Sequence, residues 1–267
     1  MASITRVASG TYDLGLGDIS SLIEFHAQHD GPAPVQAVYQ YYNRAPFVII
    51  GRKDRGISND FASLKGKKVA AAAVEATRRC WPMVARKLGL DTNLFAWSTT
   101  DFSARDNVMV RGDVDAATYF HDSAVSLFAR MPQSELSVLK YEQTGLKLYG
   151  NAILASRQLI EQRPQVVRAF LAASQQALLE TLSNPQAALA AVQAREPMLQ
   201  AEVERQRWAI SQQYLSNAET QSHGLGQIRS DVLNQQIQDV KTVFGLPRAP
   251  AAEQVFNTSL MPTLYRA

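Results

Sequence analysis

Short strand-like runs alternate with helical segments along the first 156 residues of this chain. The helical segments show amphipathic spacing, as over 77–90, where Trp81, Val84 and Leu88 share one face. The strand-like runs are rich in β-branched, aromatic or small residues, and they fall at 12–17, 35–42, 46–53, 69–74, 94–98, 114–119, 136–141 and 151–156. Because strands that alternate with helices are typical of α/β folds, we predict an α/β architecture with mostly parallel strand pairing.

Helical patterns dominate the chain after Arg157. Four helices are expected there, at 165–182, 185–194, 199–215 and 229–244. Amphipathic helices need an apolar surface to cover, so this helical C-terminal region should pack back onto the part of the chain that contains the strands. A further helix should occupy the first residues and end at Gly10.

The composition excludes several classes of protein. The 267 residues carry a net charge of +3 without any block of Lys or Arg, so we expect no nucleic-acid partner. No run is long and apolar enough to span a bilayer. The single cysteine, Cys80, can form neither an internal disulfide nor a cysteine zinc cluster. His26 and His29 lie three residues apart but are interpreted as a polar helix end, so we expect no metal and no cofactor.

Two stretches share one pattern, a strand that opens into a polar loop before a helix. They are GTYDLGLGDISSLIE at 10–24 and GDVDAATYFHDS at 112–123. In the first stretch, Ser21 and Glu24 fit a capping box, which predicts where the helix starts. A repeated unit would give two similar lobes, although Gly-x-apolar-Asp is also a frequent way to begin a strand. In open α/β sheets ligands bind beyond the carboxyl ends of the strands, and helix N-termini there favour carboxylate, sulfonate or phosphate groups.

The first candidate ligand-binding residues lie in loops that follow strands. Asp18 and Ser20 follow the first strand, and helix capping is the rival role for both. Glu75, Thr77 and Arg78 lie between a strand and the helix at 77–90. There Thr77 can cap the helix and Arg78 can bind an oxyanion with two hydrogen bonds, unless the segment is only a solvated first turn.

Aromatic and polar residues complete the candidate set. Tyr42 and Asn43 end the second strand, where a tyrosine could stack on a flat ring or simply pack in the core or on the surface. Tyr119 and His121 occupy the loop of the second stretch. Such residues suit a small planar or amphipathic solute, and Arg78 adds the option of an anion.

Five motifs, in this order, resemble those of the solute-binding proteins of ABC importers. They are YDLGLGDISS at 12–21, APFVIIGRK at 45–53, LKGKKV at 64–69, GDVDA at 112–116 and LYGNAI at 148–153. The resemblance covers nearly the whole chain. It is greatest for the branch that takes up nitrate, sulfonates, taurine and pyrimidine precursors of thiamine.

The resemblance implies a two-lobed fold like that of type 2 periplasmic binding proteins, with the ligand in a cleft between the lobes. Lobe 1 would comprise 1–46 and 151–267, and lobe 2 would comprise 47–150. Tyr149 and Asn151 would lie at the second crossing between the lobes and reach the ligand. The implied protein is periplasmic and monomeric. It catalyses no reaction, closes on a solute of the sulfonate, taurine or thiamine-precursor class, and delivers this solute to a membrane permease.

The chain departs from this family at its start, and two other functions compete with transport. Family members carry a secretion signal or lipoprotein anchor and a first strand–loop–helix unit before the point where this chain begins, so we expect that unit to be missing from lobe 1. The main alternative is a pyrimidine-synthase-like enzyme of thiamine biosynthesis, but Cys80 alone cannot supply its cysteine-rich iron motif. The other is the ligand-sensing domain of a transcription regulator, for which a winged helix would be expected.

Overall fold

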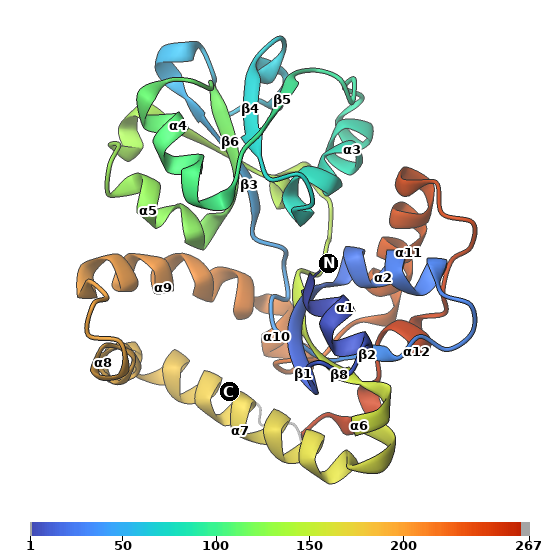
Figure 1. The fold of residues 1–267 in the computed structure, drawn as a ribbon. Helices are drawn as coiled ribbons and strands as arrows, with labels where there is room; N and C mark the ends of the chain where they lie inside the picture. The colour runs from blue at the N-terminus through green and yellow to red at the C-terminus, as the bar shows by residue number, and fades with distance from the viewer. Residues whose placement is uncertain (1, 263–267) are drawn as a thin grey trace. The chain divides into compact units, whose positions relative to one another are not determined.

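The computed structural model describes residues 2–262 and confirms the α/β fold class (Figure 1). The strands are β1 (Leu14–Asp18), β2 (Val35–Gln40), β3 (Phe47–Arg52), β4 (Lys68–Ala71), β5 (Ala96–Thr99), β6 (Ala116–Phe120), β7 (Leu136–Lys140) and β8 (Asn151–Ser156). The helices are α1 (Ala2–Ala8), α2 (Ile19–Gln28), α3 (Ala76–Leu88), α4 (Arg105–Arg111), α5 (Val125–Phe128), α6 (Arg157–Gln162), α7 (Pro164–Ser183), α8 (Pro185–Arg195), α9 (Ala201–Leu215), α10 (Ala218–His223), α11 (Ser230–Phe244) and α12 (Ala252–Val255).

The chain divides into two compact units. Unit 1 comprises Met1–Ala45, Lys147–Met198 and Gln212–Ala267, and unit 2 comprises Pro46–Leu146 and Leu199–Ser211. The first part of α9 therefore belongs to unit 2, whereas the predicted lobe 1 includes it. The predicted lobe boundaries at 46/47 and 150/151 remain a prediction.

The sheet of unit 1 has three strands in the order β1-β8-β2. β8 is antiparallel to both neighbours, with Asp18 of β1 opposite Asn151 and Gln40 of β2 opposite Ala152. The prediction of mostly parallel pairing is wrong for this sheet. The reason is that β8 begins at the carboxyl ends of β1 and β2, so it has to run in the opposite direction between them.

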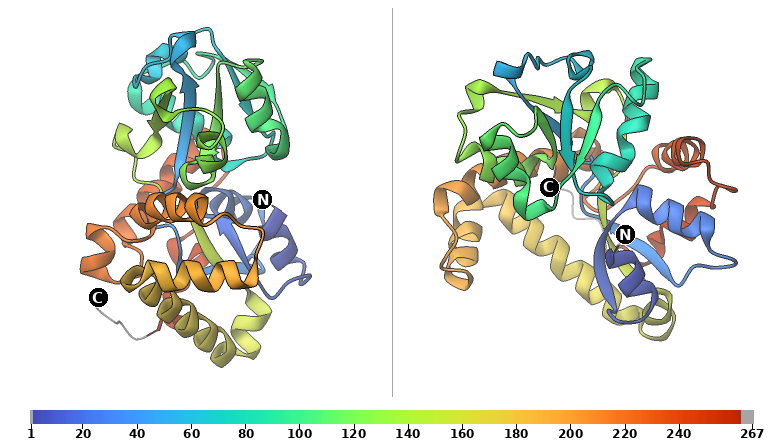
Figure 2. Two further views of the ribbon diagram at one scale, coloured as in Figure 1. Left: turned by 90° about the vertical axis from the view of Figure 1, so that its left-hand side faces the viewer. Right: turned by 45° about the horizontal axis from the view of Figure 1, so that its top comes forward.

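Helices cover both faces of this sheet. Ile4 of α1 is fully buried, and a Cβ atom at Gly17 would lie 2.6 Å from Leu154 Cδ1 and 3.1 Å from Ile4 Cγ1. A side chain at Gly17 would crowd Leu154 of β8 and Ile4 of α1, so the glycine helps α1 to pack closely on this face of the sheet. The opposite face of β1 carries Leu14 and Leu16, because side chains alternate along a strand, and the long helix α7 runs alongside that face (Figure 2).

The sheet of unit 2 has five strands in the order β5-β4-β6-β3-β7. β4 is parallel to β5 and β6, but β3 is antiparallel to β6 and β7, with Phe47 opposite Phe120 and Ile49 opposite Leu139. The parallel prediction is therefore correct only for β4 and its two neighbours. Apolar side chains from several elements form a core in this unit, among them Val48, Ile50, Ala70, Met109, Ala117 and Leu127.

The start of α2 corrects the predicted capping box. The helix begins at Ile19, and the carboxylate of Asp18 caps it by accepting a hydrogen bond from the Ser21 backbone N–H at 2.9 Å. Ser21 therefore lies in the first turn of the helix and is not its cap. Asp18 caps the helix in place of Ser21 because, as the last residue of β1, it has the extended backbone that an N-cap residue needs.

Candidate functional site

All six candidate residues of unit 1 lie at one edge of its sheet, where β1 and β2 end and β8 begins. Asp18 is opposite Asn151 in the ladder, and Ile19 N donates to Gly150 O at 3.3 Å. Tyr42 N donates to Asn151 O at 2.9 Å. The main chain thus brings together the loops after β1 and β2 and the segment before β8.

Gln236 of α11 joins two of these segments from inside the unit. Its side-chain Nε2 donates to Ser20 Oγ at 3.0 Å and to Tyr149 O at 3.1 Å, while its Oε1 accepts from Tyr149 N at 2.9 Å. Gln236 and Ser20 are both buried. The sequence analysis missed Gln236, although its position was a readable signal, because it shares the buried face of α11 with Val232 and Ile237.

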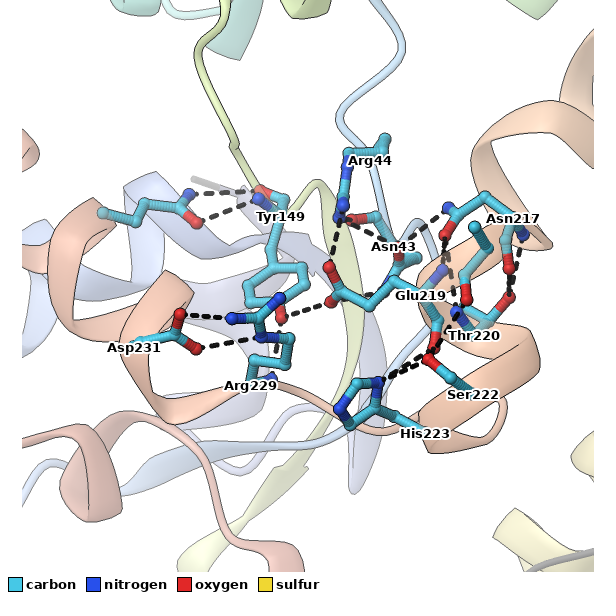
Figure 3. A network of polar contacts seen from close by, with 12 residues as sticks. Asn43, Arg44, Tyr149, Asn217, Glu219, Thr220, Ser222, His223, Arg229 and Asp231 are labelled. Atoms are coloured by element: carbon cyan, nitrogen blue, oxygen red, sulfur yellow. Dashed lines mark hydrogen bonds and ion pairs between the residues drawn. The ribbon is translucent and has the colours of Figure 1, made fainter.

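Glu219 of α10 is the centre of a second polar network in unit 1 (Figure 3). Its carboxylate accepts from Arg44 Nη2 at 2.7 Å, from Tyr149 Oη at 2.8 Å and from Asn43 Nδ2 at 3.3 Å. Burial alone would raise the pKa of Glu219, but the hydrogen bonds from Arg44 and Tyr149 outweigh it and hold the pKa below its usual value. Glu219 is therefore a carboxylate at neutral pH, and it binds the side chains of two candidate residues, Asn43 and Tyr149.

The hydroxyl of Tyr149 also accepts a hydrogen bond from the Arg229 backbone N–H at 2.8 Å. Asn43 Oδ1 accepts from Asn217 Nδ2 at 2.8 Å and from Arg44 Nη1 at 3.0 Å. Both candidate side chains thus have internal partners (Figure 3). The contact of these two side chains with a ligand stays a prediction. Their hydrogen bonds show that they link α10 to the segments before β3 and β8.

Tyr42 is arranged differently, because its ring is only half-buried. The ring meets that of Tyr41 edge to face, with centroids 5.3 Å apart and an interplanar angle of 88°. This geometry is a favourable one for two aromatic rings and leaves part of the Tyr42 ring accessible.

In unit 2, the candidate residues lie at the carboxyl ends of β4 and β6. Tyr119, which was expected in the loop, is a residue of β6 itself and lies opposite Val48 of β3, and His121 directly follows the strand. Glu75 occupies the N-cap position of α3 but turns its carboxylate inward. It accepts hydrogen bonds from Ala72 N at 3.2 Å and from the Thr118 hydroxyl, and it lies 3.4 Å from Arg105 Nη1. Burial is the largest influence on Glu75 and raises its pKa above the usual value, although these partners oppose the effect.

Arg105, which the sequence analysis missed, lies at the centre of this cluster. Its guanidinium carbon lies 4.1 Å from the ring centroid of Tyr119, in a cation–π arrangement, and the Tyr119 hydroxyl donates to Asp106 Oδ1 at 2.7 Å. Arg105 is 8% exposed and shares the buried face of α4 with Met109, one helical turn away. A charged residue on an otherwise apolar helix face was the only signal in the sequence.

Arg78 lies at the surface of the same edge. Its Nη1 donates to Thr99 Oγ1 at 3.1 Å, and its guanidinium carbon lies 5.0 Å from the ring centroid of Trp97. No carboxylate of residues 2–262 forms an ion pair with Arg78. This guanidinium therefore keeps donors for an external anion, close to the backbone N–H groups in the first turn of α3.

Two other candidates of unit 2 offer less to a ligand. Thr77 is buried, and its carbonyl accepts from the Tyr141 hydroxyl at 2.9 Å. Burial lowers the pKa of His121 to about 4, and its ring packs edge to face on Phe128. His121 is therefore a neutral side chain near pH 7 and brings no positive charge to an anion.

Within the described part of the chain, no group of three His, Cys, Asp or Glu side chains is arranged to hold a metal ion. Cys80 is fully buried in α3. Among residues 2–262, no helix has both the length and the apolar character needed to cross a membrane.

Comparison with known families and structures identifies the relatives of this chain. The family model described as NMT1/THI5 like matches residues 1–188, which is more than half of the sequence. The chain belongs to the NMT1/THI5-like family. No curated protein matches it in sequence.

Solved structures share the fold of this family member at low sequence identity. The ligand-binding component of an ABC-type import system from Staphylococcus aureus is 13% identical, with a TM-score of 0.74 over 99% of this chain and 84% of that chain. The periplasmic aliphatic sulphonate binding protein of Escherichia coli is 20% identical, with a TM-score of 0.70 over 99% and 80%. The alkanesulfonate-binding protein of Xanthomonas axonopodis pv. citri, solved with MOPS, is 16% identical, with a TM-score of 0.74 over 96% and 84%. This likeness confirms the predicted periplasmic-binding-protein fold.

Proposed function

We propose that this protein is the substrate-binding component of an ABC importer. It captures a small organic anion or an aromatic, pyrimidine-like solute, of the sulfonate, taurine or thiamine-precursor class, outside the cytoplasm and delivers this solute to a membrane permease. Binding and release suffice for this role, so no reacting group is required. The family and the fold support the proposal, since the three solved relatives described above are named as binding proteins or ligand-binding components.

The observation that carries the proposal is the position of Arg78 in unit 2. Its guanidinium is half-buried, stacks on Trp97 and forms no ion pair with the described carboxylates. It lies at the start of α3, beyond the carboxyl end of β4, which is where open α/β sheets bind ligands. The adjacent Trp97 ring offers an apolar surface, so an anion that carries an aliphatic or aromatic group fits this edge best.

The proposal predicts which ligands the protein binds. A thermal-shift screen should compare taurine, an alkanesulfonate, an aromatic carboxylate and an uncharged pyrimidine, and titration calorimetry should follow for those that stabilise the chain. At least one of these compounds should raise the melting temperature, because a ligand that binds only the folded state stabilises it. If none of these compounds binds, the proposed function is wrong.

A pair of arginine variants tests the anion contact itself. Arg78→Ala should weaken binding of the anion by about 10- to 100-fold, which is the usual effect of losing a charge-assisted hydrogen bond. Arg86→Ala is the matched control, because Arg86 is an exposed arginine in the last turn of the same helix. Equal affinities for the two variants would contradict the assignment of Arg78.

A further inference from the structure

Arg105 of unit 2 is a buried cation that is poorly paired. Its side chain is 9% exposed. Its Nη1 donates to Glu75 Oε2 at 3.4 Å, which is long compared with the usual distance of about 2.8 Å between charged groups. Its Nε is buried and has no hydrogen-bond partner among residues 2–262. Because buried charged groups are normally paired and hydrogen-bonded, this guanidinium is expected to have a further partner.

Two aromatic rings lie against the Arg105 guanidinium. Its carbon atom lies 4.1 Å from the ring centroid of Tyr119 and 5.2 Å from that of Phe102. Such rings attract a cation through their faces, but they accept none of the N–H groups that point outward in the guanidinium plane. Phe102 is 61% exposed, so one wall of the cluster is a surface side chain. The Nε–H group is therefore left for an acceptor that approaches in the plane of the guanidinium.

Glu75 shares its carboxylate among several donors and is a weak counter-ion for Arg105. Its Oε1 accepts from the Thr118 hydroxyl, and its Oε2 accepts from Ala72 N at 3.2 Å as well as from Arg105. Burial raises the pKa of Glu75, although the nearby positive charges oppose this effect. Glu75 therefore holds a proton more readily than an exposed glutamate, and when protonated it leaves Arg105 without the negative charge that faces it.

Three titratable side chains, each from a different element, interact with the charge of Glu75. Arg105 comes from α4 and Arg78 from α3, and both are cations that favour the carboxylate form. Tyr141, which begins the short 3-10 helix Tyr141–Thr144, is buried, and burial raises its pKa well above the usual value, so it stays neutral. The ionisation of Glu75 therefore depends on the two arginines. An anion bound to either of them would favour protonation of Glu75.

We infer that Arg105 is a second anion-binding residue of unit 2, beside Arg78, and that Glu75 is the resting counter-ion which the ligand anion replaces. The oxyanion accepts hydrogen bonds from the Arg105 guanidinium, and the Glu75 carboxylate takes up one proton from solvent. One negative charge thus replaces another, and the buried cluster keeps its net charge. The inference rests on the proposed function, because it assumes that this edge of unit 2 binds an anion.

This exchange favours the anion of a strong acid. Such an oxyanion stays fully ionised beside a protonated Glu75, whereas a carboxylate ligand has a similar affinity for the proton and would compete for it. Butane-1-sulfonate is therefore the probe, since it is ionised at every pH of the experiment. The buffers should be cationic, such as bis-Tris and Tris, because sulfonate or phosphate buffers would compete with the probe.

Titration calorimetry of the full chain with butane-1-sulfonate measures the proton uptake directly. The apparent binding enthalpy should differ between bis-Tris and Tris at pH 7, because the buffer supplies the proton that Glu75 takes up. The affinity should be about tenfold higher at pH 6 than at pH 8, which corresponds to an average uptake of about half a proton. Burial lowers the pKa of His121 to about 4, so this candidate residue stays neutral over the same range.

Two variants test the roles of the pair. Glu75→Gln removes the competing negative charge but keeps the side-chain shape, so it should bind the probe about tenfold more tightly than the unaltered protein at pH 8 and without proton uptake. A merely structural role of Glu75 would not raise the affinity. Asp113→Asn is the control, because Asp113 pairs with an arginine at the surface, with its side chain 47% exposed, and should change neither quantity.

Arg105→Lys keeps the positive charge but loses Nε and the planar guanidinium, so it should bind the probe about tenfold more weakly. Arg130→Lys is the control, because Arg130 is an exposed arginine of unit 2 that donates to Asn107 Oδ1. Circular dichroism with thermal melting should show that all four variants are folded.

Several results would overturn the inference. If butane-1-sulfonate binds without proton uptake, or binds equally to Arg105→Lys and Arg130→Lys, the exchange at Arg105 is wrong while the proposed function stands. An affinity of Glu75→Gln no higher than that of the unaltered protein at pH 8 has the same meaning. If butane-1-sulfonate does not bind at all, the exchange is wrong as well, and the other compounds of the thermal-shift screen decide the proposed function separately.

Discussion

Glu219 shows how a single residue can organise a whole edge of unit 1. Its carboxylate contacts Arg44 and Asn43, which precede β3, and Tyr149, which precedes β8. The side chains of Glu219 and Arg44 are 8% and 19% exposed, so their ion pair is only partly screened by water. Pairs of this kind contribute mainly through the penalty for leaving one partner alone.

Glu219→Gln should therefore lower the free energy of unfolding of unit 1 by about 2 kcal/mol, since Arg44 would lose its anion while the side-chain shape is kept. Urea unfolding followed by far-UV circular dichroism measures this change. Tryptophan fluorescence is the internal reference, because Trp81, Trp97 and Trp208 all lie in unit 2.

Asp231→Asn is the control for the loss of a surface ion pair. Asp231 pairs with Arg229 at 2.5 Å, but its side chain is 65% exposed, and surface pairs contribute little. A Glu219→Gln variant as stable as Asp231→Asn would mean that the buried network does not support this edge.

At the scale of elements, the junction between β1 and α2 determines where the first loop of unit 1 lies. The strand ends at Asp18, and the same residue caps the helix that starts at Ile19. One side chain thus ends one element and starts the next. This leaves no flexible loop between them and fixes Ser20 inside the first helical turn.

Asp18→Ala should lower the free energy of unfolding by about 1 kcal/mol, the usual cost of removing an N-cap. Asp18→Asn should cost little, because asparagine is an equally good cap, so it separates the capping role from a charge contact with a ligand. Urea unfolding measures the first effect and calorimetric titration with the ligand measures the second.

The stabilities of two alanine variants distinguish the predicted capping box at Ser21 from the observed cap at Asp18. If Ser21 were the N-cap, Ser21→Ala would be the more destabilising change. We expect the reverse order, with Asp18→Ala the less stable of the two, because the Ser21 backbone N–H donates to the Asp18 carboxylate.

At the scale of the whole molecule, each unit contains one buried histidine that is neutral when folded. Burial lowers the pKa of His26 in unit 1 and of His121 in unit 2 to about 4, from an ordinary value of 6.5. Between these values the unfolded chain binds more protons than the folded chain. The free energy of unfolding therefore rises with pH over this range. The contribution that depends on the two neutral histidines is fully present above pH 6.5 and is lost as the pH falls through about 4.

Acidification from pH 7.5 to 5 should thus destabilise both units, by up to about 2 kcal/mol for each histidine. His26→Gln should flatten the pH dependence in circular dichroism, and His121→Gln should flatten it in tryptophan fluorescence, which reports on unit 2. Glu75 has the opposite effect on the pH dependence of stability. Its raised pKa lets the folded state keep a proton that the unfolded state has lost, so acidification favours the folded state at this residue. An unchanged pH profile in both histidine variants would contradict the prediction.

Local periodicity in the sequence determined the types of most elements. The strand predicted at 151–156 is β8, and the helices predicted at 165–182, 185–194 and 229–244 are α7, α8 and α11, with ends that differ by at most one or two residues. Such patterns can be read because an amphipathic helix or a buried strand places its apolar residues at fixed spacings. The ordered motifs likewise indicated the family and the fold.

Strand direction, helix capping and the polar networks were decided only by the tertiary structure. β8 and β3 run against their neighbours because of where the chain enters each unit, and no local pattern contains that information. Gln236 lies 216 residues from Ser20, and Glu219 lies 175 residues from Arg44, so their hydrogen bonds depend on contacts that sequence spacing does not encode. The sequence by itself determined the elements and the family, while folding alone determined which polar side chains meet, because pairing between distant segments is a property of the packed chain.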